Sequence, residues 1–416
     1  MMQTDLLIIG AGPGGYRAAE LAAKQGLQVV IVEQDEVGGT CLNRGCIPTK
    51  CYVHSATFEA ACERVAQVVP QLRPGVEGIL SHPAITLLRG RAEFVDAQTV
   101  RVDGDCVIAN NIIIATGSRA KLLPLTDIGD PRVVTSTELL QMSTLPKKLC
   151  IIGAGVIGME FASVFQRFGS EVTVIEYLKE CLPMLDSDVA KRLRKLLEKR
   201  GITFRMKTAV QSLADIDADV ILMATGRQPN TDGLNLEAAG IALAPNGSIP
   251  VDDNYQIVNC KSSNCNCFAI GDVNGRQMLA HAAEAQALRV INNIMGHADG
   301  IRFDIIPAAI FTEPEAACVG FSEDQLKEQG TVYHCGKAFH RANGKALAMG
   351  ETDGMIKLLS DAEGKIVGCH AFGAHSADLV QEVAALMCRD TTVAQLRDMV
   401  HIHPTLSELL LAAANI

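Results

Sequence analysis

Residues 5–33, DLLIIGAGPGGYRAAELAAKQGLQVVIVE, decide the fold, because their pattern recurs in residues 148–176, KLCIIGAGVIGMEFASVFQRFGSEVTVIE. Each copy has a short apolar strand, a glycine-rich turn, a helical stretch and a second apolar strand that ends in glutamate. Continuous apolar strands joined by a helix predict a parallel sheet that is covered on both faces. The sequence therefore predicts an α/β protein with two Rossmann-like nucleotide-binding domains.

Length and composition narrow the classes of function. The 416 residues are enough for two or three domains, and 48% hydrophobic with 20% charged residues is typical of a globular protein. The net charge of −10 and the absence of Trp argue against a nucleic-acid-binding surface. No signal peptide and no apolar run of about 20 residues is found. We therefore expect a cytoplasmic protein without a membrane span.

The 14 cysteines are mostly expected to act as small buried apolar residues. Cys260, Cys265 and Cys267 resemble a metal site, but they lack the paired C-x-x-C spacing of zinc sites. We predict no metal site.

The first glycine motif is G-x-G-x-x-G at Gly10, Gly12 and Gly15, between a predicted strand and a predicted helix. Such glycines permit a tight turn, approach of the backbone to a pyrophosphate, and close packing of helix on strand. Glu33, at the end of the second strand, can accept hydrogen bonds from ribose hydroxyls. A glycine motif alone could be only a tight structural turn. Together with the preceding strand, the following helix and the acidic residue at the end of the second strand, it predicts dinucleotide binding.

The second glycine motif, Gly153, Gly155 and Gly158 followed by Glu176, has the same spacing. A carboxylate at the end of the second strand favours a free 2′-hydroxyl over a 2′-phosphate, so this site is expected to prefer NAD to NADP. Two dinucleotides in one chain suggest hydride transfer between a nicotinamide and a flavin.

Residues 38–50, GGTCLNRGCIPTK, place Cys41 and Cys46 five positions apart. On a regular helix five steps rotate by roughly 140°, so the two side chains would not face each other. Gly45 and Pro48 are residue types that would let the helix distort until the cysteines meet. A strained pair of this kind suits thiol–disulfide exchange better than support of the fold. The alternative is two unrelated buried cysteines.

The C-terminal residues HIHPTLSE offer an acid/base group. Pro404 would hold His403 extended and begin a helix that carries Glu408 one turn inside it. Glu408 could then bind one imidazole nitrogen and raise the basicity of the other. The alternative for a His before Pro is an ordinary loop residue, and this remains the interpretation of His401.

Taken together, these motifs closely resemble the dihydrolipoamide dehydrogenase branch of the class I pyridine nucleotide-disulfide oxidoreductases. The resemblance covers nearly the whole chain in order, through ATGS, GAGVIGMEFASV, ATGRQPN, AIGDV, MLAHAAEAQ, FTEPEAACVG and HIHPTLSE. It implies an FAD-binding domain at residues 1–145 and 229–302, an NAD-binding domain at 146–228, and an α+β dimerisation domain at 303–416.

The resemblance also implies roles for residues. Cys41 would exchange with a dihydrolipoyl substrate, Cys46 would be the thiolate beside the flavin, and His403 with Glu408 would serve the other subunit of a homodimer. Lys50 would contact FAD and could pair with Glu160, and Gly226 would border the nicotinamide. The full set implied for binding FAD or NAD is Gly10, Gly12, Gly14, Gly15, Glu33, Gly39, Thr40, Lys50, Ala92, Thr116, Gly117, Ser118, Gly153, Gly155, Val156, Ile157, Gly158, Glu160, Glu176, Gly226, Asp272, Met278, Leu279, Ala280 and His281.

The sequence departs from the family pattern in two places. The stretch between Lys50 and Ala115 and the region from about Arg205 to Asp219 are both shorter than in the family. Neither deletion touches a catalytic motif. Rival functions are a reductase of another disulfide or of mercuric ion, a single-cysteine NADH oxidase, and a non-catalytic flavin-binding subunit. The intact cysteine pair, and the absence of cysteine after Cys388, disfavour the mercuric reductase and the oxidase.

Overall fold

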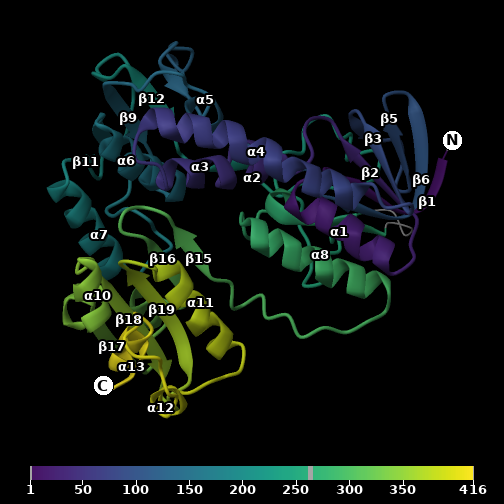
Figure 1. Ribbon diagram of the computed structural model, residues 1–416. Helices are drawn as coiled ribbons and strands as arrows, with labels where there is room; N and C mark the ends of the chain where they lie inside the picture. The colour runs from purple at the N-terminus through teal and green to yellow at the C-terminus, as the bar shows by residue number, and fades with distance from the viewer. Residues whose placement is uncertain (1, 261–265, 416) are drawn as a thin grey trace. The chain divides into compact units, whose positions relative to one another are not determined.

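The computed structural model describes residues 2–260 and 266–415 (Figure 1). The chain forms two compact units from alternating stretches of sequence. The first comprises Met1–Ser55, Glu59–Lys121 and Gly226–Ile301, and the second comprises Ala56–Phe58, Leu122–Thr225 and Arg302–Ile416. Within the described residues, no helix is both long enough and apolar enough to cross a membrane.

The main sheet of the first unit has the strand order β3-β2-β1-β6-β5-β4, with β14 also paired to β6. Its core is parallel, and β4 and β5 extend it in antiparallel pairing. A separate antiparallel pair joins β7 to β13. The strands are β1 (Met2–Ile9), β2 (Val29–Glu33), β3 (Ile85–Arg89), β4 (Ala92–Phe94), β5 (Thr99–Val102), β6 (Asp105–Ile114), β7 (Ser118–Ala120), β13 (Arg227–Pro229) and β14 (Cys267–Ala269).

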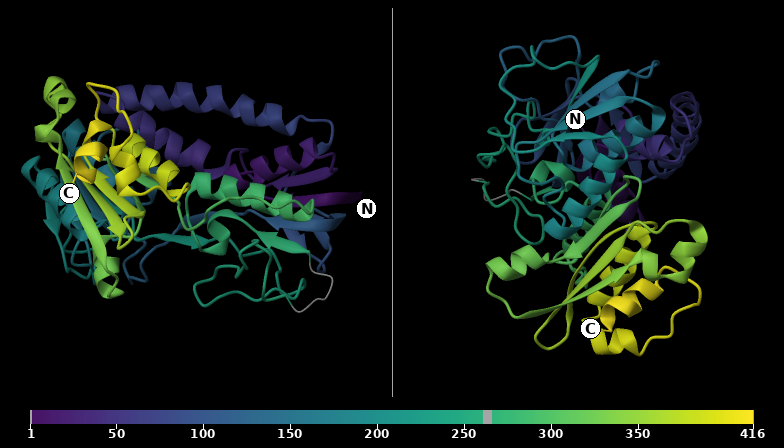
Figure 2. Two further views of the ribbon diagram at one scale, coloured as in Figure 1. Left: turned by 90° about the horizontal axis from the view of Figure 1, so that it is seen from below. Right: turned by 90° about the vertical axis from the view of Figure 1, so that its left-hand side faces the viewer.

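Two helices of the first unit, α1 (Pro13–Lys24) and α8 (Ala280–Ile294), lie side by side although they are far apart in the sequence (Figures 1 and 2). Helix α1 begins at a proline, which can occupy the first turn because its missing N–H is not needed there. The other helices of this unit are α2 (Gly39–Arg44), α3 (Cys46–Val53), most of α4 (Phe58–Leu80) and the short 3-10 helix η1 (Gly271–Asn274).

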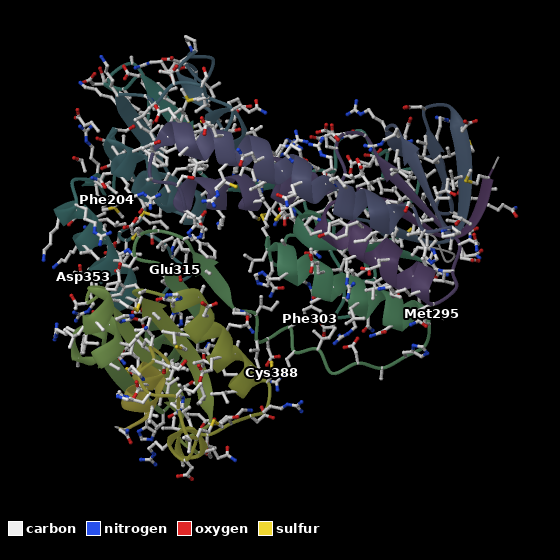
Figure 3. The ribbon with its side chains drawn as sticks, in the orientation of Figure 1. Phe204, Met295, Phe303, Glu315, Asp353 and Cys388 are labelled. Atoms are coloured by element: carbon white, nitrogen blue, oxygen red, sulfur yellow. The ribbon has the colours of Figure 1, made fainter. Side chains whose placement is uncertain are left out.

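The second unit has a parallel sheet of order β11-β10-β9-β12-β8, whose first four strands repeat the order β3-β2-β1-β6 of the first unit. Phe204, labelled in Figure 3, lies in β11 and pairs with Val174 of β10. The elements are β8 (Val133–Val134), α5 (Ser136–Leu139), β9 (Lys148–Ile152), α6 (Val156–Phe168), β10 (Glu171–Ile175), α7 (Ser187–Lys199), β11 (Thr203–Arg205) and β12 (Val220–Met223).

The second unit also contains an antiparallel sheet with the order β15-β16-β19-β18-β17. An apolar core joins alternate residues of this sheet, such as Ile356 and Leu358, to side chains of α11 and α13. The elements are β15 (Ala308–Ile310), β16 (Ala316–Gly320), α9 (Glu323–Glu328), β17 (Tyr333–Phe339), η2 (His340–Ala342), α10 (Gly344–Met349), β18 (Met355–Asp361), β19 (Ile366–Phe372), α11 (Ser376–Met387), α12 (Val393–Arg397) and α13 (Glu408–Ala414).

The predicted fold class, two parallel nucleotide-binding sheets and a C-terminal α+β part, is confirmed. The domain boundaries given above stay a prediction. Cys265, one of the three cysteines weighed as a metal site, lies outside the described residues.

Candidate active site

The first glycine motif forms a turn that only glycine can fill. Gly10 follows β1 with a φ of +104°, and a Cβ there would lie 2.5 Å from the carbonyl oxygen of Ala115. A Cβ on Gly15 would lie 1.9 Å from the carbonyl oxygen of Gly10. The first turn of α1 therefore packs directly on the end of β1, and the backbone N–H groups of its N-terminus suit an anionic pyrophosphate.

Glu33 ends β2 and holds this turn. Its Oε2 accepts a hydrogen bond from the N–H of Ala11 at 2.7 Å, and its Oε1 accepts one from the N–H of Asp35 at 2.9 Å. Burial raises the pKa of the Glu33 carboxyl, while the bond from Ala11 acts in the opposite direction. A carboxylate oxygen has lone pairs for more than one donor, so these bonds leave capacity for a ribose hydroxyl.

The second glycine motif has the same geometry in the second unit. A Cβ on Gly153 would lie 2.4 Å from the carbonyl oxygen of Ala224, and a Cβ on Gly158 would lie 2.0 Å from that of Gly153. Glu176 accepts hydrogen bonds from the N–H groups of Ala154 at 2.6 Å and Leu178 at 2.7 Å. The sequence repeat is thus also a structural repeat, in which Glu33 and Glu176 accept hydrogen bonds from equivalent backbone N–H groups.

We expect Gly15→Ala to lose bound FAD, because its Cβ would overlap backbone that has no flexible end to move. The distortion should cost about 1–3 kcal/mol in the free energy of unfolding. Flavin absorbance per chain and thermal melting measure the two effects. Gly75→Ala is the matched control, since Gly75 lies in α4 and a Cβ there has nothing within 4 Å. A Gly15→Ala protein with full flavin content would contradict the assignment of this turn to FAD.

We expect Glu176→Ala to weaken NAD binding by about tenfold to a hundredfold, the usual effect of losing a charged hydrogen-bond partner. The preference for NAD over NADP should fall as well, since the charge that repels a 2′-phosphate is gone. The KM values for both nucleotides measure this change. Glu171→Gln, an exposed position at the start of β10, the strand that ends just before Glu176, should leave both KM values unchanged. An unaltered preference in Glu176→Ala would show that another residue selects the nucleotide.

The two cysteines lie on either side of a break between helices. Helix α2 ends at Arg44, α3 begins at Cys46, and Gly45 between them has non-helical backbone angles. A Cβ on Gly45 would lie 2.9 Å from the carbonyl oxygen of Thr40. The predicted helix distortion is confirmed, and its position is Gly45. Pro48 lies in the first turn of α3, where proline is tolerated, and in an unbroken helix it would lack the N–H for the carbonyl of Arg44.

This break brings the Cys41 and Cys46 side chains within hydrogen-bonding contact. The contact with Cys46, followed by burial, raises the pKa of the Cys41 thiol, whereas the charge of Lys50 acts in the opposite direction. Cys46 is exposed and Cys41 is half-buried. The pair is therefore adjacent and accessible, as exchange with a substrate requires.

Side-chain hydrogen bonds that the sequence did not predict stabilise the segment that carries the two cysteines. Asn43, between the two cysteines, donates its Nδ2 to the carbonyl oxygens of Val37 and Gly39, each at 2.9 Å. Arg73 of α4 donates to the Oδ1 of Asn43 at 2.9 Å. The hydrophobic pattern of the sequence gave no signal for this contact, because it joins residues 30 positions apart.

Three residues implied for FAD binding lie in two polar clusters of the first unit. The Ser118 hydroxyl donates to Asp272 at 2.5 Å and accepts from Arg227 at 2.6 Å. The Thr116 hydroxyl donates to the carbonyl oxygen of Asn230 at 2.7 Å, and the Asn230 side chain donates back to the Thr116 carbonyl at 3.0 Å. Arg227 and Asn230 were not among the predicted site residues, although both belong to the quoted ATGRQPN motif.

The remaining predicted cofactor residues divide between the units. In the first unit, Gly39 and Thr40 begin α2, and buried Ala92 begins β4. Gly117 precedes β7, Gly226 precedes β13, and residues 278–281 span the start of α8 at Ala280. A Cβ on Gly39 would lie 2.7 Å from the Cα of Gly12, so the glycine turn and the redox segment touch. In the second unit, Gly155, Val156 and Ile157 start α6, and buried Glu160 accepts from the N–H of Phe311 at 2.9 Å.

His403 and Glu408 form the predicted hydrogen bond, with 2.9 Å between Nδ1 and Oε1. The Glu408 Oε2 accepts from the N–H of Thr405 at 2.9 Å, and this bond, followed by that to His403, lowers the pKa of the Glu408 carboxyl. The helix was expected to start at Pro404, but α13 begins at Glu408 and the His403–Pro404 peptide bond is cis. The Thr405 bond ties Glu408 to the turn before the helix. The expected imidazole–carboxylate pair is therefore present with a different backbone around it.

The His403 side chain is 79% exposed. Its neighbours Val400 and Ile402 are 99% and 79% exposed, unusual values for apolar side chains. This apolar segment and the imidazole therefore face away from the described core of their own unit.

Comparisons with known proteins agree with this geometry. Residues 4–287 match the family model described as pyridine nucleotide-disulphide oxidoreductase, and residues 306–414 match the dimerisation domain of that family. The dihydrolipoyl dehydrogenase of Chlamydia muridarum is 35% identical over 445 residues, which cover 97% of this chain and 95% of the relative. That of Geobacillus stearothermophilus is 36% identical over 458 residues, with coverage of 100% and 96%.

Among solved structures, the HOCl-induced flavoprotein disulfide reductase RclA from Escherichia coli matches with a TM-score of 0.92 and 31% identity, over 99% of each chain. The alignments with the dehydrogenases are longer than the 416 residues of this chain, so the relatives contain residues that it lacks. The resemblance inferred from the motifs is confirmed. The chain belongs to the pyridine nucleotide-disulphide oxidoreductase family, whose members are oxidoreductases that use FAD and NAD.

Proposed function

We propose that this protein oxidises a dihydrolipoyl dithiol to its disulfide and reduces NAD⁺, with Cys41 and Cys46 as the redox-active pair. The observation that carries the proposal is the contact of these two cysteines across the break at Gly45. Full-length similarity to dihydrolipoyl dehydrogenases supports the choice of substrate.

The glycine turns fit the two dinucleotides. Each begins with a glycine whose Cβ would collide with the carbonyl of Ala115 or Ala224, and each leads into a helix N-terminus. Each also lies beside a carboxylate, Glu33 or Glu176. FAD, when bound, supplies the two-electron chemistry that links dithiol oxidation to reduction of NAD⁺.

The dithiol reaction then follows from side-chain chemistry. His403 takes the proton of one substrate thiol through Nε2, because its Nδ1 is bonded to Glu408. The substrate thiolate attacks the Cys41 sulfur, the Cys41–Cys46 bond breaks, and Cys46 leaves as a thiolate. The second substrate sulfur displaces Cys41 and closes the substrate disulfide. Two electrons have passed to the protein, which is left with both cysteines reduced.

We further propose that the active site is shared in a homodimer, with Cys41 from one subunit and His403 from the other. The match to the dimerisation domain supports the dimer. Val400 and Ile402 are exposed beside Met399 and His403, and a group of neighbouring exposed apolar side chains is typical of an interaction surface, which supports a second copy of the chain as its partner. The cytoplasmic location expected from the sequence stays a prediction.

A second candidate function uses the same cysteines in the opposite direction, with NADH reducing another acceptor. The observation that favours it is the match to RclA, which is described as a disulfide reductase and has also been solved as a Cu(II) complex.

One assay separates the two functions. Purified protein loaded with flavin is given NAD⁺ with dihydrolipoamide, and separately NADH with lipoamide, glutathione disulfide or Cu²⁺. Faster turnover with the lipoyl pair supports the proposal. Turnover confined to glutathione disulfide or Cu²⁺ selects the second candidate, and no turnover with any acceptor indicates a flavin-binding subunit without catalysis.

A further inference from the structure

A buried ionic cluster in the second unit lies outside the motifs that carry the proposed function. The Asp186 and Lys357 side chains are each 1% exposed, and the Lys357 Nζ lies 2.6 Å from the Asp186 Oδ1. The same Nζ lies 2.6 Å from the Glu323 Oε2. Taking a lysine and a carboxylate out of water costs several kcal/mol per ion, so such a pair persists only where its geometry is well satisfied.

The sheet register places Lys357 opposite the apolar core. Ile356 and Leu358 belong to the core formed with α11 and α13, and neighbouring side chains of a strand point to opposite faces. Lys357 of β18 pairs with His370 of β19, so both side chains emerge on the same face. On that face they meet Asp186, the residue that caps α7.

Every polar group of Asp186 except its carbonyl is used in this cluster. Its N–H donates to the His370 Nδ1 at 3.0 Å, and its Oδ2 accepts from the N–H of Glu323 at 3.0 Å. Burial lowers the pKa of His370 to about 4, which keeps the ring neutral and its Nδ1 free to accept. The His370 Nε2 lies 3.1 Å from the carbonyl oxygen of Phe321 and donates to it in this tautomer. Asp186 is therefore fixed in position by β18, β19 and the start of α9.

Asp186 is also the last residue of the loop that begins at Glu176, which we call the 176–186 loop. At its start, the Glu176 carboxylate binds the N–H of Ala154 in the glycine turn. At its middle, the N–H of buried Leu182 donates to the carbonyl oxygen of Ala154 at 2.9 Å. At its end, Asp186 is held by the antiparallel sheet. The loop is thus anchored at both ends, and one of these anchors lies 171 positions away in the sequence.

We propose that the buried Asp186–Lys357 pair is a positioning device for the NAD site, which holds the 176–186 loop so that Glu176 and the glycine turn present a formed pocket to the adenosine half of NAD. This inference rests on the proposed assignment of NAD to the second glycine motif. Its physical basis is preorganisation: a loop that is already fixed loses less conformational entropy when the ligand binds.

The test is the affinity for ADP-ribose, measured by calorimetry on flavin-loaded protein, because this ligand occupies the adenosine half and undergoes no redox reaction. Lys357→Met should weaken ADP-ribose binding by about threefold to thirtyfold, the range found for residues that act on a site from a distance. Flavin content should not change. No dithiol takes part in this measurement, so the expected change in affinity does not depend on the lipoyl substrate being correct. If the unmodified protein does not bind ADP-ribose, the assignment of NAD to the second glycine motif is wrong.

Two further variants make the result decisive. The double variant Asp186→Asn with Lys357→Met leaves no buried charge at position 186, and Glu323 keeps Lys327 at 2.9 Å, so it should fold even if the single variant does not. It should still bind ADP-ribose more weakly than the unmodified protein, because the anchor is gone. Arg289→Met removes a less buried ion pair, at 2.8 Å from Asp299, in the first unit and should leave the affinity within about twofold.

Unchanged ADP-ribose affinity in a folded Lys357→Met or double variant would overturn the proposal. Joint loss of flavin and ADP-ribose in the double variant would overturn it too, because the pair would then support the whole fold and not the loop.

Discussion

Cys41→Ser is expected to abolish the oxidation of dihydrolipoamide, lowering the rate of NAD⁺ reduction by about four orders of magnitude or more, as removal of a catalytic nucleophile does. A serine hydroxyl is a weak nucleophile and cannot form the disulfide with Cys46. The contact at Gly45 depends on the backbone, which the substitution leaves alone, so flavin should remain bound. Steady-state formation of NADH measures the loss, and flavin absorbance confirms that the protein is loaded.

Two controls test whether the loss of turnover is specific to the Cys41–Cys46 pair. Cys388→Ser changes an exposed free thiol of the second unit and should leave turnover unaltered (Figure 3). Oxidation of NADH by ferricyanide, which takes electrons without a dithiol, should continue in Cys41→Ser. Dihydrolipoamide turnover retained by Cys41→Ser would remove Cys41 from the mechanism.

His403→Gln is expected to reduce turnover with dihydrolipoamide by about a hundredfold to ten-thousandfold, the usual contribution of a general base. Glutamine can still donate a hydrogen bond to Glu408, but it cannot take the proton of a thiol. The lowered pKa of Glu408 means that its carboxylate stays ionised at lower pH than a free glutamate. The His403–Glu408 bond should therefore hold as the pH falls through the ordinary range of glutamate titration. His401→Gln is the neighbouring control, and its turnover should stay close to that of the unmodified protein.

Mixing the two inactive proteins tests whether the site is shared. In a mixed dimer of Cys41→Ser and His403→Gln subunits, a shared architecture gives one site with both native residues and one with neither. Random reassociation makes half of the dimers mixed, so about a quarter of the original activity should return. If the residues act within one subunit, every site carries one defect and no activity returns.

Local chemistry explains which features the sequence could predict. The glycine turns and the glutamates that end their strands follow from short spacings, and the structure places Glu33 and Glu176 against equivalent amides. The helix break between Cys41 and Cys46 also follows from Gly45. Pro48 contributes to the same break, because in an unbroken helix it could not donate to the carbonyl of Arg44, four positions earlier.

The features that escaped prediction depend on distant partners. The start of α13 at Glu408, and not at Pro404, accompanies the bond from Thr405. The Arg73–Asn43 and Lys357–Asp186 contacts join residues 30 and 171 positions apart. Lys357 lies within the apolar strand MIKLLSD. From the sequence alone, a lysine between hydrophobic residues of a strand is expected to face solvent. Only the folded chain shows that it is buried against a carboxylate.

The burial of Lys357 against Asp186 also limits which substitutions this protein can accumulate during evolution. Loss of Lys357 alone leaves the Asp186 carboxylate buried without a cation, which commonly costs about 3–5 kcal/mol, whereas loss of both charges is often tolerated. A cost of that size is a large fraction of the stability of a domain. Lineages should therefore rarely lose Lys357 alone, and an intermediate that keeps only Asp186 would survive only on a background made more stable by other substitutions.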